Sequence, residues 1–249
     1  MAVGWLRCTT YSVDLIKAPM ALRRLAAMRR HVPQRTLHTL LRHAYNGLPD
    51  GFSIEPADRQ KIQSVDGGLV DASFDAATYG EVTPKGVATL IHALHLDDTS
   101  VFYDLGSGRG VAVLQVALQS DVRVQRAVGV ELSTSRHEIA VQALEGLAAR
   151  VPSVRERVQF ICADLGKSNF YQDATEVFCT NLLFGHTLNR SLSTQLARSE
   201  SLRRVATLKP LEQPDAARLR LLCILKLPFT WASQCRVYVY ERRRRAARR

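Results

Sequence analysis

A glycine-rich segment separates a predicted strand from a predicted helix near the middle of the chain. Its sequence is Asp104-Leu105-Gly106-Ser107-Gly108-Arg109-Gly110, and it lies between the mainly apolar stretches 100–105 and 111–119. A glycine turn from the end of a strand into a helix is typical of open sheets of parallel strands, where it lies at the ligand-binding edge. The segment therefore predicts an α/β fold with a ligand site at its glycines.

Strand and helix signals alternate along the rest of the chain. Thr83 and Pro84 predict the start of a helix that runs to about residue 95, and Ser135 with Glu138 predicts a capping box for a helix to about residue 150. A further helix is predicted at 188–196, and further strands at 127–131, 157–162, 176–180, 203–208, 219–226 and 235–241. Strands separated by helices imply crossover connections and a mainly parallel sheet covered on both faces.

The N-terminal part has a different composition. Residues 18–46 have apolar positions at helical spacing among arginines, which predicts two short amphipathic helices interrupted at Pro33. Residues 47–76 contain glycines and prolines with little periodicity and are predicted to be a connecting loop. We therefore divide the chain into a basic helical segment with its linker (1–69), a principal domain (70–241) and a basic tail (242–249).

Charge is distributed unevenly over the chain, whose formal net charge is +11. Residues 1–49 have 8 Lys and Arg against one acid, and residues 201–249 have 13 against three, whereas residues 50–200 have 13 against 19. Basic ends on an acidic body indicate contact with a polyanion such as DNA, because Lys and Arg release counterions when they neutralise phosphates. The alternative is that the basic ends only increase solubility.

Several classes of protein are excluded by the sequence. Charged residues interrupt every apolar run before it reaches the roughly 20 residues that a membrane-spanning helix needs. The five cysteines are at least 12 residues apart, and the seven histidines are scattered, so no metal site is predicted. The odd number and wide spacing of the cysteines fit a reduced intracellular compartment, and the N-terminus lacks the pattern of a secretory signal.

The spacing of the glycines indicates the ligand. Gly-x-Gly-x-Gly, with Asp104 two residues before the first glycine, is the form seen in class I S-adenosylmethionine-dependent methyltransferases. Carboxylates follow the next two strands: Glu131 is placed to accept hydrogen bonds from ribose hydroxyls, and Asp164 from the adenine amine. Asp104 itself is placed near the methionine ammonium, which needs an anionic or carbonyl partner once it is desolvated.

A set of motifs resembles the disruptor-of-telomeric-silencing family. In order, these motifs are Tyr79-Gly80-Glu81-Val82, the glycine segment, Gly129-Val130-Glu131, Ala163-Asp164-Leu165, Thr180-Asn181-Leu182-Leu183-Phe184-Gly185, and the stretch 227–238, in which Trp231 precedes Tyr238 by seven residues. The likeness covers about residues 70–241. It implies a Rossmann-like class I methyltransferase fold with a mainly parallel seven-stranded sheet, and a methyltransferase that modifies a lysine on the globular core of histone H3 in the nucleosome.

The resemblance also implies which residues form the site. The segment 79–82 would close over the methionine moiety, Asn181 and Phe184 would face the reacting centre, and Trp231 and Tyr238 would line the lysine channel. The implied cofactor-binding set is Tyr79, Gly80, Glu81, Val82, Phe102, Asp104, Leu105, Gly106, Ser107, Gly108, Gly110, Glu131, Asp164 and Leu165. Two positions depart from the family pattern: Thr180 replaces the first residue of an Asn-Asn pair, and Val111 replaces a glutamine after the glycine segment.

Alternatives remain open at this point. The basic ends would also suit a nucleic-acid methyltransferase, although Asn181-Leu182-Leu183-Phe184 lacks the prolines usual in enzymes that methylate base amines. Another reading is a non-catalytic assembly factor that keeps the fold and holds RNA. The enzyme resemblance favours the nucleus, whereas the Arg-rich, acid-poor first 49 residues would also fit a mitochondrial presequence.

Overall fold

The computed structural model describes residues 34–64, 79–119, 123–167, 171–212, 214 and 218–243. All of them belong to one compact unit, Val32–Arg249. The helix predicted before Pro33 and most of the predicted basic tail lie outside the described residues. Within the described residues, no helix is both long and apolar enough to span a bilayer.

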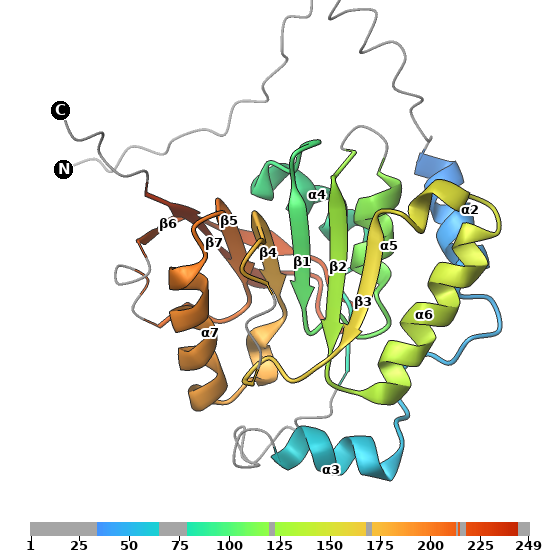
Figure 1. Cartoon of the computed structure of the whole chain (residues 1–249), viewed down its shortest axis with the longest axis horizontal. Coiled ribbons are helices and arrows are strands. Elements are labelled where there is room, and N and C mark those ends of the chain that lie inside the picture. Colours follow the sequence, from blue (N-terminus) through green and yellow to red (C-terminus); the bar gives the residue numbers. More distant parts are fainter. Residues whose placement is uncertain are drawn as a thin grey trace, which may run out of the picture. The chain divides into compact units, whose positions relative to one another are not determined.

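Seven strands form a single sheet in the order β3-β2-β1-β4-β5-β7-β6 (Figure 1). The strands are β1 (Val101–Leu105), β2 (Arg126–Glu131), β3 (Val158–Cys162), β4 (Glu176–Cys179), β5 (Arg204–Thr207), β6 (Leu219–Leu227) and β7 (Cys235–Arg242). β1 to β5 pair in parallel, and β7 pairs antiparallel with both β5 and β6. The predicted class I methyltransferase fold, with its mainly parallel seven-stranded sheet, is confirmed.

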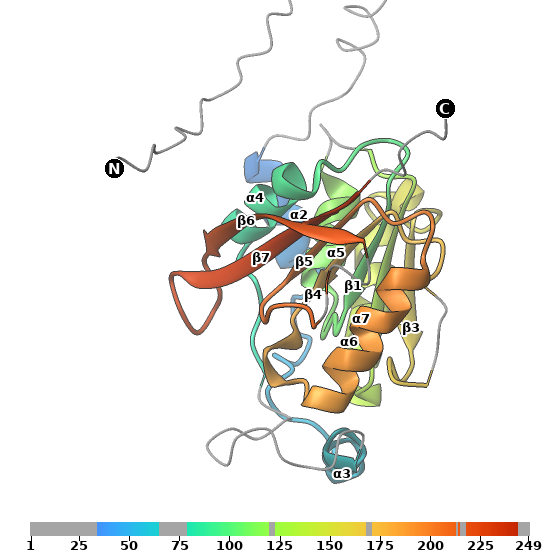
Figure 2. The same cartoon turned by 90° about the vertical axis from the view of Figure 1, so that its left-hand side faces the viewer.

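Helices cover both faces of the sheet, as Figures 1 and 2 show. One apolar cluster joins one side of the strands to α4 (Pro84–Leu94), α5 (Val111–Leu118) and α6 (Thr134–Ala148). A second cluster joins the other side to α7 (His186–Arg198) through Leu192 and Leu196. Since both faces are buried, the central strands are almost continuously apolar, which is the pattern that predicted them.

The N-terminal described segment is part of this core. α2 (Gln34–Ala44) buries Leu37 and Leu41 against α5 and α6. The region predicted as a loop contains a helix, α3 (Pro56–Ser64), so that prediction was wrong there. Asp58 is the only buried residue of α3, and a helix that is polar on nearly every side has no apolar periodicity to reveal it.

Asp58 attaches α3 to the start of α6. Its carboxylate accepts hydrogen bonds from the hydroxyls of Ser133 and Ser135 and from the backbone N–H groups of Thr134 and Ser135, at 2.7–3.0 Å. Burial opposes ionisation, but these donors hold the pKa of Asp58 well below its usual range. The predicted capping box at Ser135 was therefore wrong by two residues: Ser133 is the N-cap of α6 and accepts from the N–H of Arg136.

Asp58→Ala is expected to lower the free energy of unfolding by about 1–3 kcal/mol at pH 7, because several donors at the start of α6 lose their acceptor. The pKa of Asp58 is lower in the folded state, so its contribution is present above the unfolded-state pKa and is lost as pH falls through the folded-state pKa. Urea denaturation at pH 7 and pH 3 tests both statements. Glu156→Ala, at an exposed carboxylate, is the control, and equal effects of the two substitutions would contradict the proposed cap.

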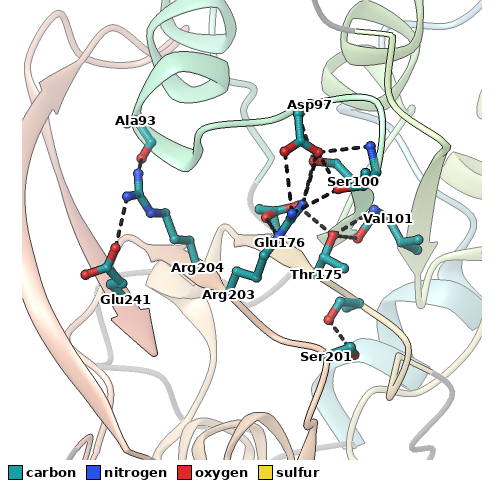
Figure 3. A network of polar contacts seen from close by, with 12 residues as sticks. Ala93, Asp97, Ser100, Val101, Thr175, Glu176, Ser201, Arg203, Arg204 and Glu241 are labelled. Carbon is teal, nitrogen blue, oxygen red and sulfur yellow. Dashed lines mark hydrogen bonds and ion pairs between the residues drawn. The ribbon is translucent and has the colours of Figure 1, made fainter. Parts of the chain in front are cut away.

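A polar network holds the strand starts together at the edge of the sheet opposite the glycine segment (Figure 3). Glu176 is 1% exposed, and both of its carboxylate oxygens accept from the guanidinium of Arg203 at 2.6 and 3.1 Å. Arg203 also reaches Asp97, and Thr175 bridges Glu176 to the N–H of Val101 at the start of β1. The charged side chains of Asp97, Glu176 and Arg203 therefore pair with one another and hold these strand starts in place.

Candidate cofactor and active site

The glycine segment forms a tight loop from the end of β1 to the start of α5. Gly106, Gly108 and Gly110 have φ values of 84°, 54° and 80°, in the left-handed region that favours glycine. The N–H groups of Gly106 and Ser107 both donate to the carbonyl of Val130 on β2 at 2.9 Å. The loop is thus fixed to the neighbouring strand, and α5 begins directly beyond it.

Glu131 lies at the end of β2 and faces this loop. One carboxylate oxygen accepts from the N–H of Gly108 and the other from the N–H of Ser133, both at 2.8 Å. The residue is 8% exposed. A carboxylate oxygen has more than one acceptor direction, so Glu131 keeps the capacity to accept further hydrogen bonds.

Asp104, the last residue but one of β1, is buried without a complete set of partners. It is 3% exposed, and its Oδ1 has no hydrogen-bond partner among the described residues. The buried hydroxyl of Ser107 also lacks a hydrogen-bond partner within this part of the chain. Burial raises the pKa of the Asp104 carboxyl to about 8, and the nearby charges of Glu131 and Glu81 add to the shift. An unpaired buried carboxyl beside two other acids is typical of a site built for a cation.

A hollow that is open to solvent lies at this edge of the sheet and is called the cavity below. It brings together the whole 79–82 segment, part of the glycine loop, the start of α5 and the ends of β1 and β4. The residues that line it are Tyr79, Gly80, Glu81, Val82, Asp104, Gly106, Ser107, Gly108, Val111, Ala112, Phe178 and Thr180. Eight of these belong to the cofactor-binding set predicted from the sequence.

The 79–82 segment closes one side of the cavity. The Tyr79 ring covers Gly108 so closely that a Cβ on that glycine would lie 2.5 Å from the ring. The Tyr79 hydroxyl donates to Glu81 Oε1 at 2.5 Å and accepts from the N–H of Arg109 at 3.1 Å. Arg136 lies over the Tyr79 ring at 4.4 Å, and Phe52 meets the ring edge-on at 5.6 Å.

The loop between β6 and β7 packs against the same segment. Thr230 exchanges hydrogen bonds with the backbone of Glu81, and Val82 forms an isolated antiparallel bridge with Phe229. The Trp231 ring lies on Gly80, where an added Cβ would be 2.1 Å from the ring, and Trp231 is 44% exposed. Two of the predicted motifs, about 150 residues apart in sequence, therefore meet beside the cavity.

Phe184 and Asn181, which were predicted to face the reacting centre, lie in different environments. The Phe184 ring lies against Gly106, close enough that a Cβ there would be 3.3 Å away. Asn181 is 1% exposed: its amide donates to Asn189 and its Oδ1 accepts from the N–H groups of Leu208 and Lys209. The structure therefore does not bring the Asn181 side chain to the cavity wall; the neighbouring residue, Thr180, lines it instead.

Seven further predicted residues are not among those that line the cavity: Phe102, Leu105, Gly110, Glu131, Asp164, Leu165 and Tyr238. Phe102, Leu105 and Leu165 are buried in the apolar clusters on the two faces of the sheet. Asp164 is engaged in its own turn, where it accepts from the N–H of Gly166 at 2.8 Å and lies 3.4 Å from the Lys167 ammonium. Tyr238 is partly buried on the α7 side of the sheet.

Four cavity residues were missed by the sequence reasoning: Val111, Ala112, Phe178 and Thr180. Val111 and Thr180 are the two positions noted as departures from the family pattern. Their adjacency to the glycine segment and to Asn181 was a usable signal. Ala112 on α5 and Phe178 on β4 lie in apolar stretches, and their sequence pattern indicates only core residues.

The chain matches a family model described as "Histone methylation protein DOT1" over residues 70–220. It is 31% identical over 132 residues to "Histone-lysine N-methyltransferase, H3 lysine-79 specific" of Caenorhabditis elegans, which covers 50% of this chain and 14% of that protein. It is 28% identical over 168 residues to a protein of the same description from Dictyostelium discoideum, covering 63% of this chain and 9% of that protein. The chain thus spans only a small part of these relatives.

Among solved structures, TrmN from Thermus thermophilus is similar with a TM-score of 0.51 and 19% identity, over 65% of this chain and 49% of that chain. This likeness supports the fold alone. The family model spans more than half of the chain and contains the 79–82 segment, the glycine loop, Glu131, Asp164 and Asn181. The chain therefore belongs to the DOT1 family of histone methylation proteins.

Proposed function

We propose that this protein is a histone-lysine methyltransferase that transfers a methyl group from S-adenosylmethionine to a lysine on the globular core of histone H3 in the nucleosome. The observation that carries the proposal is the family match over residues 70–220, which contains every residue of the predicted cofactor set. The names of the two relatives support the same acceptor. A nuclear location and DNA contact through the basic ends are part of the proposal.

The cavity residues fit the proposed cofactor. Asp104 offers an unpaired buried carboxyl oxygen, and Gly106 and Gly108 line the cavity without a side chain. Glu131 is not among the lining residues, but its carboxylate accepts from the N–H of Gly108, which does line the cavity, and it retains acceptor capacity. When bound, S-adenosylmethionine supplies a methyl group on a positively charged sulfonium. We assign Asp104 to the amino group of the methionine end, Glu131 to the ribose and Asp164 to the adenine amine, with the 79–82 segment as the cover.

The acceptor lysine must lose a proton before it can attack. With a pKa of about 10.4, a free lysine is neutral at pH 7 in only about one molecule in 2,500. We assign its deprotonation to desolvation between aromatic side chains, with Trp231, Tyr238 and Phe184 as the walls, and to the nearby sulfonium charge, since both lower the lysine pKa. Proton loss to water then needs no general base, and the chain contributes by positioning and by excluding water.

The decisive experiment gives the protein radiolabelled S-adenosylmethionine together with nucleosomes, free histones or RNA. We expect label in histone H3 of nucleosomes, mapped to one lysine by mass spectrometry. Label in RNA would instead support a nucleic-acid methyltransferase. Absence of cofactor binding in calorimetry would support a non-catalytic assembly factor. Fluorescent fusions at each terminus test the nuclear against the mitochondrial location.

The pH dependence of the chemical step provides a separate prediction. At saturating cofactor and acceptor, the single-turnover rate is expected to rise about tenfold per pH unit until it levels off at the lowered pKa of the bound lysine, because only the neutral amine reacts. Rapid-quench measurements from pH 6 to pH 10 test this. A rate that is constant over the whole range would contradict proton loss by desolvation.

A further inference from the structure

Arg109, which lies between two glycines of the loop, makes contacts that the sequence pattern does not account for. Its Nε and one terminal nitrogen donate to the two carboxylate oxygens of Glu81 at 3.1 and 2.9 Å. Both side chains are largely shielded from water, with 16% and 19% of their surface exposed. A two-pronged, partly buried pair of this kind fixes geometry better than a surface ion pair does.

The other side of Arg109 faces the connection between α2 and α3. Its second terminal nitrogen donates to the carbonyl of Pro49 at 3.0 Å, and the guanidinium lies 5.1 Å from the centre of the Tyr45 ring. The Tyr45 hydroxyl in turn donates to the Arg109 carbonyl at 2.8 Å. One residue thus joins three parts of the chain: the glycine loop, the 79–82 segment and residues 45–49.

Tyr79 completes the arrangement on the cavity side. Its hydroxyl shares Glu81 Oε1 with Arg109 and accepts from the Arg109 N–H, so the Glu81 carboxylate receives three donors. Tyr79, Glu81 and Gly108 all line the cavity, whereas the Arg109 side chain does not. Arg109 therefore acts on the cavity through the residues that it holds.

We propose that Arg109 is a positioning residue for cofactor binding: it holds the 79–82 segment against the glycine loop and makes residues 45–49 a working part of the cofactor site. The inference rests on the proposed function, because it takes S-adenosylmethionine as the ligand of the cavity. An arginine suits this place because its planar fork reaches Glu81 and Pro49 together. A lysine offers a single charged nitrogen and holds one of these partners.

Calorimetry with S-adenosylmethionine compares the wild type with Arg109→Ala, Arg109→Lys and Arg155→Ala. Arg155 is an exposed arginine paired with Glu145 on α6, so its removal matches the charge change at a remote place. We expect Arg109→Ala to raise the Kd roughly 10- to 100-fold, Arg109→Lys to recover part of the affinity, and Arg155→Ala to match the wild type. At saturating cofactor the kcat of Arg109→Ala is expected to fall by less than about threefold, the mark of a binding effect.

Hydrogen exchange of the full chain separates positioning from general destabilisation. In Arg109→Ala we expect faster exchange in residues 45–49 and 79–82 together, with β1, β2 and β4 unchanged. Faster exchange everywhere, or a Kd equal to that of Arg155→Ala, would overturn the inference. If the wild type binds no S-adenosylmethionine, the proposed function fails, while the paired exchange of the two segments still decides whether Arg109 holds them together.

Discussion

Asp104→Asn is expected to stabilise the cofactor-free protein and to remove most of its affinity for S-adenosylmethionine. The wild-type carboxyl is buried beside Glu131 and Glu81, and its pKa is raised to about 8. The folded state therefore holds a proton that the unfolded state releases above about pH 4, and the wild type loses stability as pH rises from there to about 8. The amide carries no such cost.

The difference in unfolding free energy between Asp104→Asn and the wild type should grow by at most about 1.4 kcal/mol per pH unit between about pH 4 and about pH 8. Above about pH 8 it should level off, because the Asp104 carboxyl is then ionised in both the folded and the unfolded state of the wild type. Thermal unfolding of both proteins at pH 5, 7 and 9 measures this. Calorimetry at pH 7.5 is expected to show a Kd raised roughly 100-fold or more, since a neutral amide cannot replace a charged partner of the ammonium. A variant that is less stable at pH 9, or that binds like the wild type, would contradict the assignment of Asp104.

The same titration predicts proton release on cofactor binding. Near pH 7 the wild-type carboxyl is mainly protonated in the empty site, and pairing with an ammonium requires it to ionise. The binding enthalpy of the wild type should therefore depend on the ionisation enthalpy of the buffer, and that of Asp104→Asn should not. The charges of Glu131, whose oxygens accept from Gly108 and Ser133, and of Glu81 contribute to the raised pKa of Asp104.

The sheet and the glycine loop were predictable because local patterns encode them. Buried parallel strands leave apolar runs, and a glycine turn at Gly106 to Gly110 marks the ligand edge irrespective of distant contacts. α3 was not predictable, because its attachment depends on one polar residue, Asp58, whose partners lie 75 to 77 residues away. Polar helices of this kind give no periodic signal.

The site was predictable as a set of strand ends and less so as individual side chains. Beyond the end of β4, the backbone dihedral angles of the turn at Thr180 and Asn181 decide which of the two side chains faces the cavity. These angles could not be predicted from the sequence. Arg109 is a second case. An arginine in a glycine loop would by itself be taken as solvated, and only the fold brings Glu81 and Pro49, 28 and 60 residues away, within its reach.

Gly108→Ala is expected to destabilise the protein and to abolish tight cofactor binding, because the added Cβ would collide with the Tyr79 ring. Gly47→Ala is the control that separates this collision from backbone strain. Gly108 has φ 54°, and an added Cβ would lie 2.5 Å from the Tyr79 ring and 2.7 Å from its hydroxyl oxygen. Gly47 has φ 78°, with no atom within 4 Å of an added Cβ. Alanine at either position costs about 1 kcal/mol in the left-handed region, and only at Gly108 must a neighbour also move.

The neighbour that moves is the residue that closes the cavity. Displacing the Tyr79 ring breaks its hydrogen bonds to Glu81 and to the Arg109 N–H, so we expect the Kd for S-adenosylmethionine to rise roughly 100-fold in Gly108→Ala and to stay unchanged in Gly47→Ala. Urea denaturation and calorimetry on both variants give the comparison. If the collision is the cause, Tyr79→Ala in the Gly108→Ala background should cost less stability than it does in the wild type, because removing the ring also relieves its collision with the added Cβ. Additive effects of the two substitutions would mean that Tyr79 and Gly108 do not act on each other, and the closed segment would then need another explanation.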